Sequence, residues 1–220
     1  MTVLPVTALV VAKAPVPGLA KTRLAASIGE DAAAGIAAAA LLDTLDAVAA
    51  TPAQERVVAL TGELSDAACG AEIRSRLADF TVVKQRGADF AERLANAHAD
   101  ASSGRPVLQI GMDTPQVTSD MLAECARSLL GTDAVLGIAD DGGWWVLGVR
   151  KPAMADCLRT VPMSRPDTGV LTFAALSATG IAVSLVAELA DFDTIDDIEA
   201  VRRMCSADSR FARATRAVGV

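Results

Sequence analysis

The sequence predicts an α/β fold built on one mixed, mostly parallel sheet of about seven strands, with helices on both faces of the sheet. Apolar, strand-like runs alternate with helix-like stretches along the chain, an order that is typical of parallel sheets covered on both sides. One junction differs, because the runs at 133–140 and 144–150 are separated by only three residues. A parallel crossover needs about a dozen residues or more, so we expect this pair to be antiparallel.

The individual elements follow from the apolar runs and their lengths. The stretch at 30–50 is rich in Ala and Leu, and its length and apolar content favour a helix. We find no internal repeat, no low-complexity linker and no block of like charges. The expected strands lie at 7–13, 56–62, 80–85, 106–113, 133–140, 144–150 and 181–189.

Length and charge limit the classes of function. A chain of 220 residues, of which 52% are hydrophobic, suits one domain with a sizeable core. The net charge is −7, whereas a protein that binds a phosphate backbone normally presents a basic face, so we expect no nucleic acid polymer as partner. A small phosphorylated ligand is compatible with this charge, because a few local cations or a metal ion suffice to hold it.

Several features predict a cytoplasmic protein without a transmembrane segment. The apolar opening has no basic start and no small-residue cleavage pattern, so we interpret it as a strand and not as a signal peptide. No apolar run reaches the roughly 18 uncharged residues of a membrane span. The cysteines form no CxxC pair, and we expect them to be small buried hydrophobic residues in a reducing compartment. They are Cys69, Cys125, Cys157 and Cys205.

The single histidine, His98, limits the available mechanisms, because a pair of histidines or a His-rich metal site is excluded. A Ser-His-Asp triad would depend on this one residue. His98 lies in the helical pattern AERLANAHADA, and we expect it on the surface of a helix or half-buried there.

The loop after the first strand, AKAPVPGLAKTRLA, carries Lys13, Lys21 and Arg23. In open α/β sheets ligands bind at the carboxyl ends of the strands, and cations positioned there favour a bound phosphate. The loop is not a Walker A motif, because Pro15 and Ala20 occupy the positions where that motif has glycine. We predict phosphate binding at this strand end, with solvated surface charge as the alternative.

A carboxylate, Asp113, follows the buried run in LQIGMDTPQVT. A carboxylate at a strand end suits Mg²⁺, which takes one or two carboxylates and completes its shell with water and substrate phosphates. The alternative is that Asp113 caps the turn before the next helix, but Thr118 and Ser119 are better placed for that role. We therefore predict that Asp113 is a metal ligand.

Two more carboxylates, Asp191 and Asp193, precede the last predicted helix start, where Thr194 and Asp197 have the spacing of a capping box. Acidic residues at that place suit the helix dipole, and this role is the alternative to metal binding. Together with Asp113 they can complete a metal site, so we predict that at least one of them is a ligand.

The segment QRGADFAERLANA lies in the middle of the chain. Gly87 ends a strand, and Asp89 has the chemistry of a helix N-cap. On spacing alone, Asp89, Glu92 and Arg93 are best interpreted as a capped and charged helix face.

Both tryptophans of the chain lie in DDGGWW at 140–145. On a strand, Trp144 and Trp145 point to opposite faces, so one should enter the core while the other lies near a cleft, where its ring can cover a sugar or a base. The two glycines permit a tight turn and a close approach of a ligand, and either aspartate can bind an acceptor hydroxyl. A hairpin with two packed tryptophans is the alternative. The predicted acceptor-binding residues are Asp141, Gly142, Gly143 and Trp144.

Four segments, in this order, resemble a bacterial family assigned as glycosyltransferases. They are AKAPVPGxxKTRL, GxDxP, DGGxWxxG and DxDTxxD, and the resemblance covers roughly residues 7–200. The segment QRGADFAERLANA also resembles the family's Gly-Asp-Leu-Gly-Glu-Arg-Met. The family looks like a relative of the 2-phospho-L-lactate guanylyltransferases and of the molybdenum-cofactor nucleotidyltransferases.

The resemblance implies the nucleotide-diphospho-sugar transferase fold of the GT-A type, a three-layer α/β/α sandwich around a mixed sheet with one antiparallel strand. Residues 1–220 would form it as a single domain. The resemblance also implies nucleotide binding at the first strand end and a divalent cation, Mg²⁺ or Mn²⁺, at Asp113. We expect Lys21, Arg23 and Asp113 to be catalytic. The predicted metal ligands are Asp113, Asp191 and Asp193, and the predicted nucleotide-binding residues are Ala12, Lys13, Ala14, Lys21, Arg23, Gln85 and Gly87.

The function predicted from these features is a metal-dependent transferase that uses a nucleotide-activated donor. In the glycosyltransferase form, a small acceptor attacks C1 of a nucleotide-sugar; in the alternative nucleotidyltransferase form, a phosphorylated acceptor attacks the α-phosphorus of a nucleoside triphosphate and releases pyrophosphate. Both forms need a cation and Lys or Arg to neutralise the phosphates. The third alternative is a nucleotide-binding module without turnover. For the assembly, the homodimer is a candidate.

Overall fold

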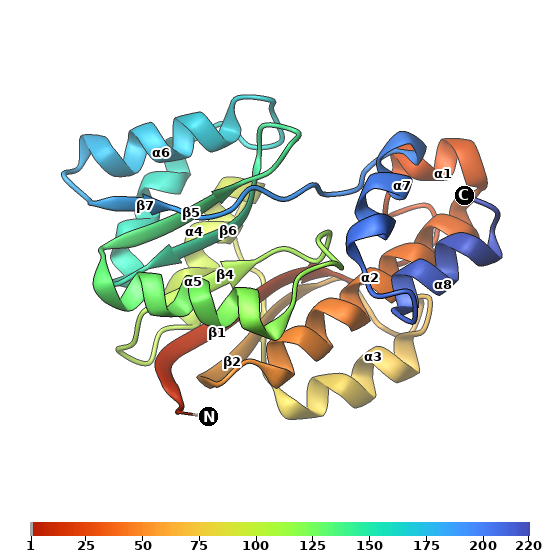
Figure 1. Cartoon of the computed structure of the whole chain (residues 1–220), viewed down its shortest axis with the longest axis horizontal. Helices are drawn as coiled ribbons and strands as arrows, with labels where there is room; N and C mark the ends of the chain where they lie inside the picture. Colours follow the sequence, from red (N-terminus) through yellow and green to blue (C-terminus); the bar gives the residue numbers. More distant parts are fainter. Residues whose placement is uncertain (1) are drawn as a thin grey trace.

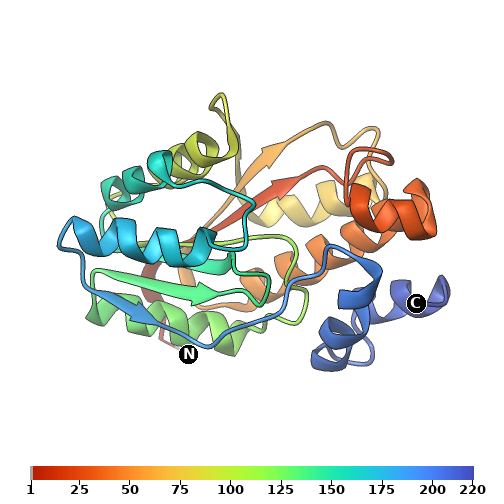
Figure 2. The same ribbon diagram turned by 90° about the horizontal axis from the view of Figure 1, so that it is seen from above.

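The structure is a computed structural model that describes residues 2–220. A seven-stranded sheet with the order β3-β2-β1-β4-β6-β5-β7 forms its centre, and helices cover both faces of this sheet (Figure 1 and Figure 2). The strands are β1 (Leu4–Lys13), β2 (Ala53–Thr61), β3 (Thr81–Lys84), β4 (Val107–Ile110), β5 (Ala134–Ile138), β6 (Trp144–Val149) and β7 (Val183–Leu185). The helices are α1 (Thr22–Ile28), α2 (Glu30–Ala50), α3 (Gly70–Arg76), α4 (Phe90–Asp100), α5 (Ser119–Gly131), α6 (Thr168–Ala178), α7 (Ile195–Met204) and α8 (Arg210–Ala217), with 3₁₀ turns η1 (Leu77–Asp79) and η2 (Pro152–Thr160).

The strand directions confirm the predicted mixed sheet. Strand β6 pairs antiparallel with both β4 and β5, and the other neighbouring strands pair in parallel. A hairpin across 139–143 reverses the chain between β5 and β6. Because β6 runs against its neighbours, its first residue, Trp144, lies at the same edge of the sheet as the last residues of β1 and β4.

The two faces of the sheet carry two separate cores. Val10 points to the face covered by α2 and α5, whereas Leu9 and Val11 point to the face covered by α4 and η2, as the alternation of side chains along a strand requires. Each fully buried side chain of this size contributes about 1.5–3 kcal/mol. The sheet and the helices packed on each of its faces are the three layers of the fold.

Helix α2 has the bounds predicted for the Ala-rich stretch. By length and composition it is the one helix of the described residues that could cross a membrane, and 67% of its most apolar window is buried inside the fold. Its fully buried alanines, such as Ala37 and Ala38, let the helix backbone approach the sheet closely. The residues that make α2 apolar are therefore core residues here.

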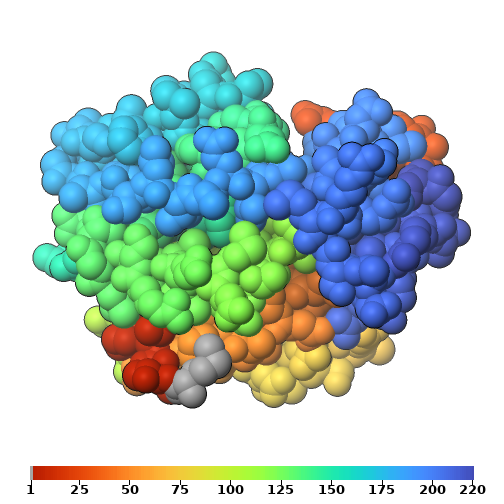
Figure 3. Space-filling model, in the orientation of Figure 1, coloured from red at the N-terminus to blue at the C-terminus, as the bar shows by residue number. Residues whose placement is uncertain are grey.

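The C-terminal helices pack against the start of the chain and not against the sheet. Phe192 and Phe211 share a third core cluster with Leu24 and Ile36, and Figure 1 shows α7 and α8 beside α1 and one end of α2. The segment from β7 to α7 reaches them by crossing one face of the molecule, as Figure 3 shows in blue. This crossing brings residues 189–194 to the edge of the sheet where β1 and β4 end.

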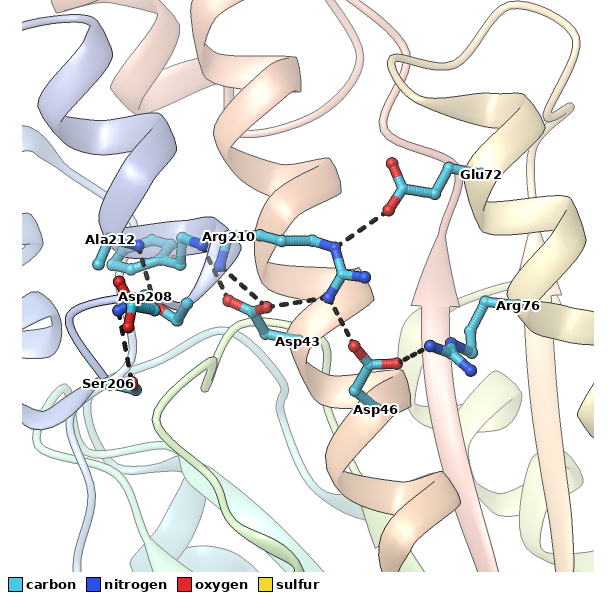
Figure 4. Close-up of polar contacts among 10 residues, drawn as sticks. Asp43, Asp46, Glu72, Arg76, Ser206, Asp208, Arg210 and Ala212 are labelled. Atoms are coloured by element: carbon cyan, nitrogen blue, oxygen red, sulfur yellow. Dashed lines mark hydrogen bonds and ion pairs between the residues drawn. The ribbon is translucent and has the colours of Figure 1, made fainter.

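Arg210 fixes α8 to α2 and α3 (Figure 4). Its guanidinium contacts Asp43 at 3.4 Å, Asp46 at 2.5 Å and Glu72 at 3.0 Å. The backbone N–H groups of Arg210 and Phe211 donate to the two carboxylate oxygens of Asp43. One side chain thus joins three helices that are far apart in the sequence.

The predicted helix starts are confirmed at three places. The carboxylate of Asp89 accepts the N–H three residues on at 2.8 Å, and the hydroxyl of Thr118 does the same at 3.2 Å. Thr194 and Asp197 form the capping box, with the Asp197 carboxylate accepting the Thr194 N–H at 2.7 Å. Thr118 and not Asp113 therefore caps α5.

The prediction for His98 was wrong, because its side chain is completely buried. His98 lies one turn beyond Leu94 on the inner face of α4, which packs on both the sheet and η2. Burial lowers the pKa of His98 to about 4, with a smaller opposing effect from Gln109. Within residues 2–220 neither ring nitrogen has a hydrogen-bond partner of good geometry.

The cysteines are all free, but they are not all buried. Cys125 is buried and two others are half-buried, whereas Cys69 is exposed, which contradicts its predicted place in the core. Cys69 lies directly before α3 with φ 53°, in the left-handed region. It turns the chain into a surface helix, and its side chain therefore does not reach the core.

Candidate active site

A cleft of about 660 Å³ opens at the edge of the sheet where β1, β2 and β4 end and β6 begins. Five segments far apart in the sequence line it: the loop after β1, the loop after β4, the β5–β6 hairpin, residues 163–168 and residues 191–193. The first residues of α4 complete the wall. The cleft thus lies at the carboxyl ends of the parallel strands, where ligands bind in open α/β sheets.

Lys21 lies at the centre of the charged part of the cleft. Its backbone has φ 48° and ψ 50°, a left-handed conformation that is uncommon for a residue with a side chain. Its ammonium lies 3.1 Å from the Asp113 carboxylate and 3.8 Å from that of Asp193. It also donates to the carbonyl of Phe192 and lies 4.3 Å from the centre of the Phe192 ring. The structure therefore brings together three predicted site residues, two of which lie 92 and 172 positions after Lys21 in the sequence.

The other two predicted cations have different surroundings. Arg23 donates to the Asp193 carboxylate at 2.7 Å while 73% of its side chain is exposed. Lys13 lines the cleft, and its ammonium donates to the carbonyl of Leu19 in its own loop at 2.6 Å. All three cations therefore face the cleft, but only the Lys21 side chain is nearly buried, at 9% exposed.

The acidic residues of the cleft act on one another. Burial, helped by the carboxylates of Asp141 and Asp113 and opposed by the charge of Lys21, raises the pKa of Asp191 to about 6. Carboxylate oxygens are the donors that Mg²⁺ and Mn²⁺ prefer, and a divalent cation would relieve this excess of negative charge. In residues 2–220, however, no three His, Cys, Asp or Glu side chains converge on one point as a metal site does. The donor chemistry fits a divalent cation, and the cations present beside these carboxylates are Lys21, which contacts Asp113 and Asp193, and Arg23, which contacts Asp193.

The predicted nucleotide wall lies along the ends of β1, β2 and β3. Gln85 is held in place by its own amide, which donates to the carbonyls of Ala12 at 2.8 Å and Ala59 at 2.9 Å. Two of the predicted residues do not line the cleft. Ala14 is buried, and Gly87 is exposed outside it. Gly87 has φ 141°, and a Cβ there would lie 2.9 Å from the N of Arg93. These contacts position the wall, and the nucleotide-binding roles of these residues stay predictions.

The β5–β6 hairpin separates the roles of the two tryptophans, as predicted. Trp145 is 3% exposed, and its indole N–H donates to the carbonyl of Ala187 at 2.9 Å. A Cβ on Gly137 would lie 2.4 Å from the same indole nitrogen, so the glycine makes room for the ring. Trp144 is half-buried and lines the cleft.

The glycines of the hairpin hold a loop in place. Gly142 has φ 85°, and a Cβ there would lie 1.8 Å from the carbonyl oxygen of Pro166. The N–H of Gly169 donates to the carbonyl of Gly142 at 2.8 Å. Gly143 lines the cleft, and its N–H donates to the Asp141 carboxylate at 2.7 Å. Gly142 itself does not line the cleft; it supports the 162–168 loop, which does.

That loop is the main part of the cleft that the sequence did not predict. Met163, Ser164 and Arg165 line the same cleft as Phe90 and Arg93 of α4. The loop sequence PMSRPDT carries proline, serine and aspartate, which indicate a turn, but no signal connects that turn with the ends of distant strands.

The family model described as "Uncharacterized protein conserved in bacteria (DUF2064)" matches residues 44–165, which is more than half of the chain. The chain belongs to the DUF2064 family. No curated protein matches this DUF2064 sequence.

Solved structures share the fold of this DUF2064 protein. A protein of Desulfovibrio desulfuricans G20, assigned as a nucleotide-diphospho-sugar transferase, is 24% identical and has a TM-score of 0.84, over 97% of this chain and 96% of that one. Rv0371c of Mycobacterium tuberculosis H37Rv, in complex with manganese, is 17% identical with a TM-score of 0.53, over 90% and 97% of the chains. CMP:2-keto-3-deoxy-manno-octonic acid synthetase, in complex with CTP, is 10% identical with a TM-score of 0.55, over 91% and 98%. The predicted nucleotide-diphospho-sugar transferase fold is thereby confirmed.

Proposed function

We propose that this protein is a divalent-metal-dependent transferase that takes its donor as a nucleotide-sugar and passes the sugar to a small acceptor. The observation that carries the proposal is the contact of Lys21 with Asp113 and Asp193 in a cleft at the strand ends. A cation and several carboxylates, held next to one another, are what a metal–diphosphate group needs on the protein. The shared fold with a protein assigned as a nucleotide-diphospho-sugar transferase supports the proposal.

The roles of the side chains follow from their charges and places. Lys21 and Arg23 bind the donor's phosphates, while Asp113 with Asp191 or Asp193 holds the Mg²⁺ or Mn²⁺. When bound, the metal ion neutralises charge on the diphosphate that leaves. Lysine has a flexible stem and a point charge, so the Lys21 ammonium can turn from the carboxylates to a phosphate when a metal ion replaces it there.

The transfer step requires an acceptor oxygen beside C1 of the sugar. That oxygen attacks C1, the bond from C1 to the diphosphate oxygen breaks, and the electron pair leaves with the nucleoside diphosphate. Asp141 lines the cleft and orients the acceptor hydroxyl, whose proton passes to solvent water as the new bond forms. Trp144 covers one face of the sugar or acceptor.

Nucleotidyl transfer is the second candidate, and one comparison favours it: a synthetase of the same fold has been solved with CTP. In this form an acceptor oxygen attacks the α-phosphorus of a nucleoside triphosphate, and pyrophosphate leaves. The phosphate-binding roles of Lys21 and Arg23 are the same in both forms, because both stabilise negative charge on a leaving phosphate.

The released product distinguishes these forms. Thermal shifts would first be screened with nucleoside triphosphates and nucleotide-sugars, each with Mg²⁺, with Mn²⁺ and with a chelator. We expect metal-dependent stabilisation by a nucleotide, followed by slow release of nucleoside diphosphate from a nucleotide-sugar. Release of pyrophosphate from a triphosphate would select the second form, and metal-dependent binding without release of either product would identify a binding module.

A further inference from the structure

A second group of residues lines the cleft, and we call the part that they line the α4 lobe. They come from α4, from the adjoining strands β4 and β6, and from the 162–168 loop, and they are Phe90, Arg93, Gln109, Trp144, Ser164 and Arg165. The carboxylates that contact Lys21 come from other segments, the loops after β4 and before α7. The charge of the α4 lobe is therefore different from that of the Lys21 side.

Arg93 has surroundings that no other half-buried arginine of the described chain shares. Arg76, Arg105 and Arg210 pair with carboxylates, and Arg56 and Arg202 donate to backbone carbonyls. Within residues 2–220, the guanidinium of Arg93 makes neither an ion pair nor a hydrogen bond, although the residue is half-buried and lines the cleft.

A partly desolvated guanidinium without a partner is costly, because it loses water contacts that no protein group replaces. An oxyanion that binds there would restore two parallel, charge-assisted hydrogen bonds at once. The nearest carboxylates along the chain, those of Asp89 and Glu92, each accept a backbone N–H at 2.8 Å and form no ion pair with Arg93 in the described residues. Arg93 is therefore available to a ligand.

A second buried polar group, Gln109, belongs to the same lobe. Gln109 is 1% exposed and interacts with the His98 ring, whose pKa it raises, but within residues 2–220 neither its side-chain oxygen nor the two His98 nitrogens have a hydrogen-bond partner of good geometry. Gln109 lines the cleft from β4. A buried amide oxygen of this kind gains from a ligand hydroxyl, since leaving it unpaired costs about 1–3 kcal/mol by the general scale for buried polar groups.

The 162–168 loop, which lines the same cleft as Arg93, is held in a fixed shape. Ser164 has φ 58°, one of three residues other than glycine with a positive φ in the described chain. The Thr168 hydroxyl accepts the N–H of Arg165 at 3.0 Å and donates to the carbonyl of Pro162 at 2.9 Å. Arg165 pairs only with the nearby Asp167. Strained backbone that the surrounding structure maintains is common at ligand sites.

We propose that the α4 lobe is the acceptor site and that it recognises an oxyanion, a phosphate or a carboxylate, through Arg93. Gln109 receives a hydroxyl of the same molecule, and Phe90 and Trp144 form its apolar walls. The acceptor of this enzyme is then a small anionic polyol or hydroxy acid and not a neutral sugar or a lipid. This inference rests on the proposed function, in which the donor occupies the Lys21 side of the cleft.

The two tryptophans make the lobe observable. Each gives one indole N–H signal in a nitrogen–proton correlation spectrum, and Trp144→Phe assigns the two signals. A ligand in the α4 lobe should shift the Trp144 signal, whereas the Trp145 indole stays bonded to Ala187 and responds less. The probes are sn-glycerol 3-phosphate, glycerate and neutral glycerol, titrated into the full chain.

We expect both anions, but not glycerol, to shift the Trp144 signal with saturation. Arg93→Gln should weaken the anion with the higher affinity by roughly tenfold to a hundredfold, the range for hydrogen bonds to charged groups, and Arg93→Lys should retain part of the affinity. Arg127→Gln is the matched control, because Arg127 is exposed on α5 at the other face of the sheet. A stronger response to the phosphate or to the carboxylate identifies which oxyanion the site prefers.

Three outcomes would overturn the inference: no saturable shift by either anion, equal shifts by glycerol, or an Arg93→Gln variant that binds the anions like the wild type. A fourth is an equal loss of nucleotide affinity in Arg93→Gln, which would place Arg93 at the donor. Failure of the proposed function is separately visible, because it would appear as absent nucleotide binding in the wild type while the titrations with the anions still report on Arg93.

Discussion

Two clusters of this molecule each place a cation among carboxylates, but we expect them to have different roles. Arg210 contacts three carboxylates, and so it joins α8 to α2 and α3 (Figure 4). Lys21 contacts Asp113 and Asp193 at the cleft. In the Arg210 cluster the planar guanidinium is fixed by several hydrogen bonds at once, whereas the Lys21 ammonium is a point charge on a flexible stem.

The carboxylates also differ in what lies beside them. The Asp43 side chain is 11% exposed and is further bound by two backbone N–H groups. Asp113 and Asp193 are 39% and 41% exposed and face the cleft. The first cluster joins three helices and does not line the cleft, so we expect it to contribute stability. The second lines the cleft and can exchange its cation, so we expect it to contribute function.

The largest expected effect is on transfer activity, in Asp113→Asn. The variant keeps the shape of the side chain but removes the charge that holds the metal ion, so activity should fall by roughly 10²-fold or more, the scale for one lost electrostatic contact in a transition state. Calorimetric titration of the nucleotide, with Mg²⁺ and with chelator, measures the metal effect in wild type and variant. Asp43→Asn is the matched control and should lower the melting temperature without changing the metal effect. An equal metal effect in wild type and Asp113→Asn would rule out the site.

The next largest effect is on stability and concerns the Arg210 cluster. Arg210→Gln removes the guanidinium that joins Asp43, Asp46 and Glu72, so we expect the free energy of unfolding to fall by about 1–3 kcal/mol. Urea unfolding measures this change, and nucleotide affinity should stay within about twofold of the wild type. A large loss of nucleotide binding in a folded Arg210→Gln protein would show that the two clusters are coupled.

Asp191 predicts a pH dependence of stability. Its pKa is raised in the folded protein to about 6, chiefly by burial, so the folded state favours the protonated acid. Asp191 therefore penalises the fold progressively as pH rises from about 4 to 6, and the penalty is complete above pH 6. Asp191→Asn should be more stable than wild type by about 1 kcal/mol at pH 7.5, after allowance for solvent screening, and equal to it below pH 4. Thermal melts at both pH values check the sign, and a destabilised variant at pH 7.5 would contradict it.

The smallest effect on stability is expected for Arg23→Ala. Arg23 pairs with Asp193 but is 73% exposed, and such surface pairs contribute about 0–1 kcal/mol. The melting temperature should hardly change, whereas nucleotide affinity should fall by roughly tenfold if Arg23 binds a donor phosphate. Lys21→Ala differs, because the buried Lys21 also bonds to Phe192, and we expect it to lower both quantities. Unaltered nucleotide affinity in both variants would mean that the cations of this loop are solvated surface charges and do not bind phosphate.

Local features of the chain were enough to predict much of the fold. A three-residue connection permits only an antiparallel pair, and β5 and β6 form one. Asp89, Thr118 and Thr194 cap helices because a side chain and an N–H three residues away are always within reach at a helix start. Carboxyl ends of parallel strands share one edge, so Lys21 and Asp113 were expected to lie near each other, and they do.

The sequence by itself therefore determined the elements, their directions and the edge of the sheet at which the charged residues gather, because these depend on interactions over a few residues and on the geometry of a parallel sheet. Only the tertiary structure decided that Lys21 contacts Asp113, that α4 packs against η2 with His98 buried, and that the 162–168 loop lines the same cleft as Arg93. Each of these depends on how a segment more than 50 residues away packs. No local pattern encodes that placement, because burial and pairing are settled by which surfaces meet when the layers close.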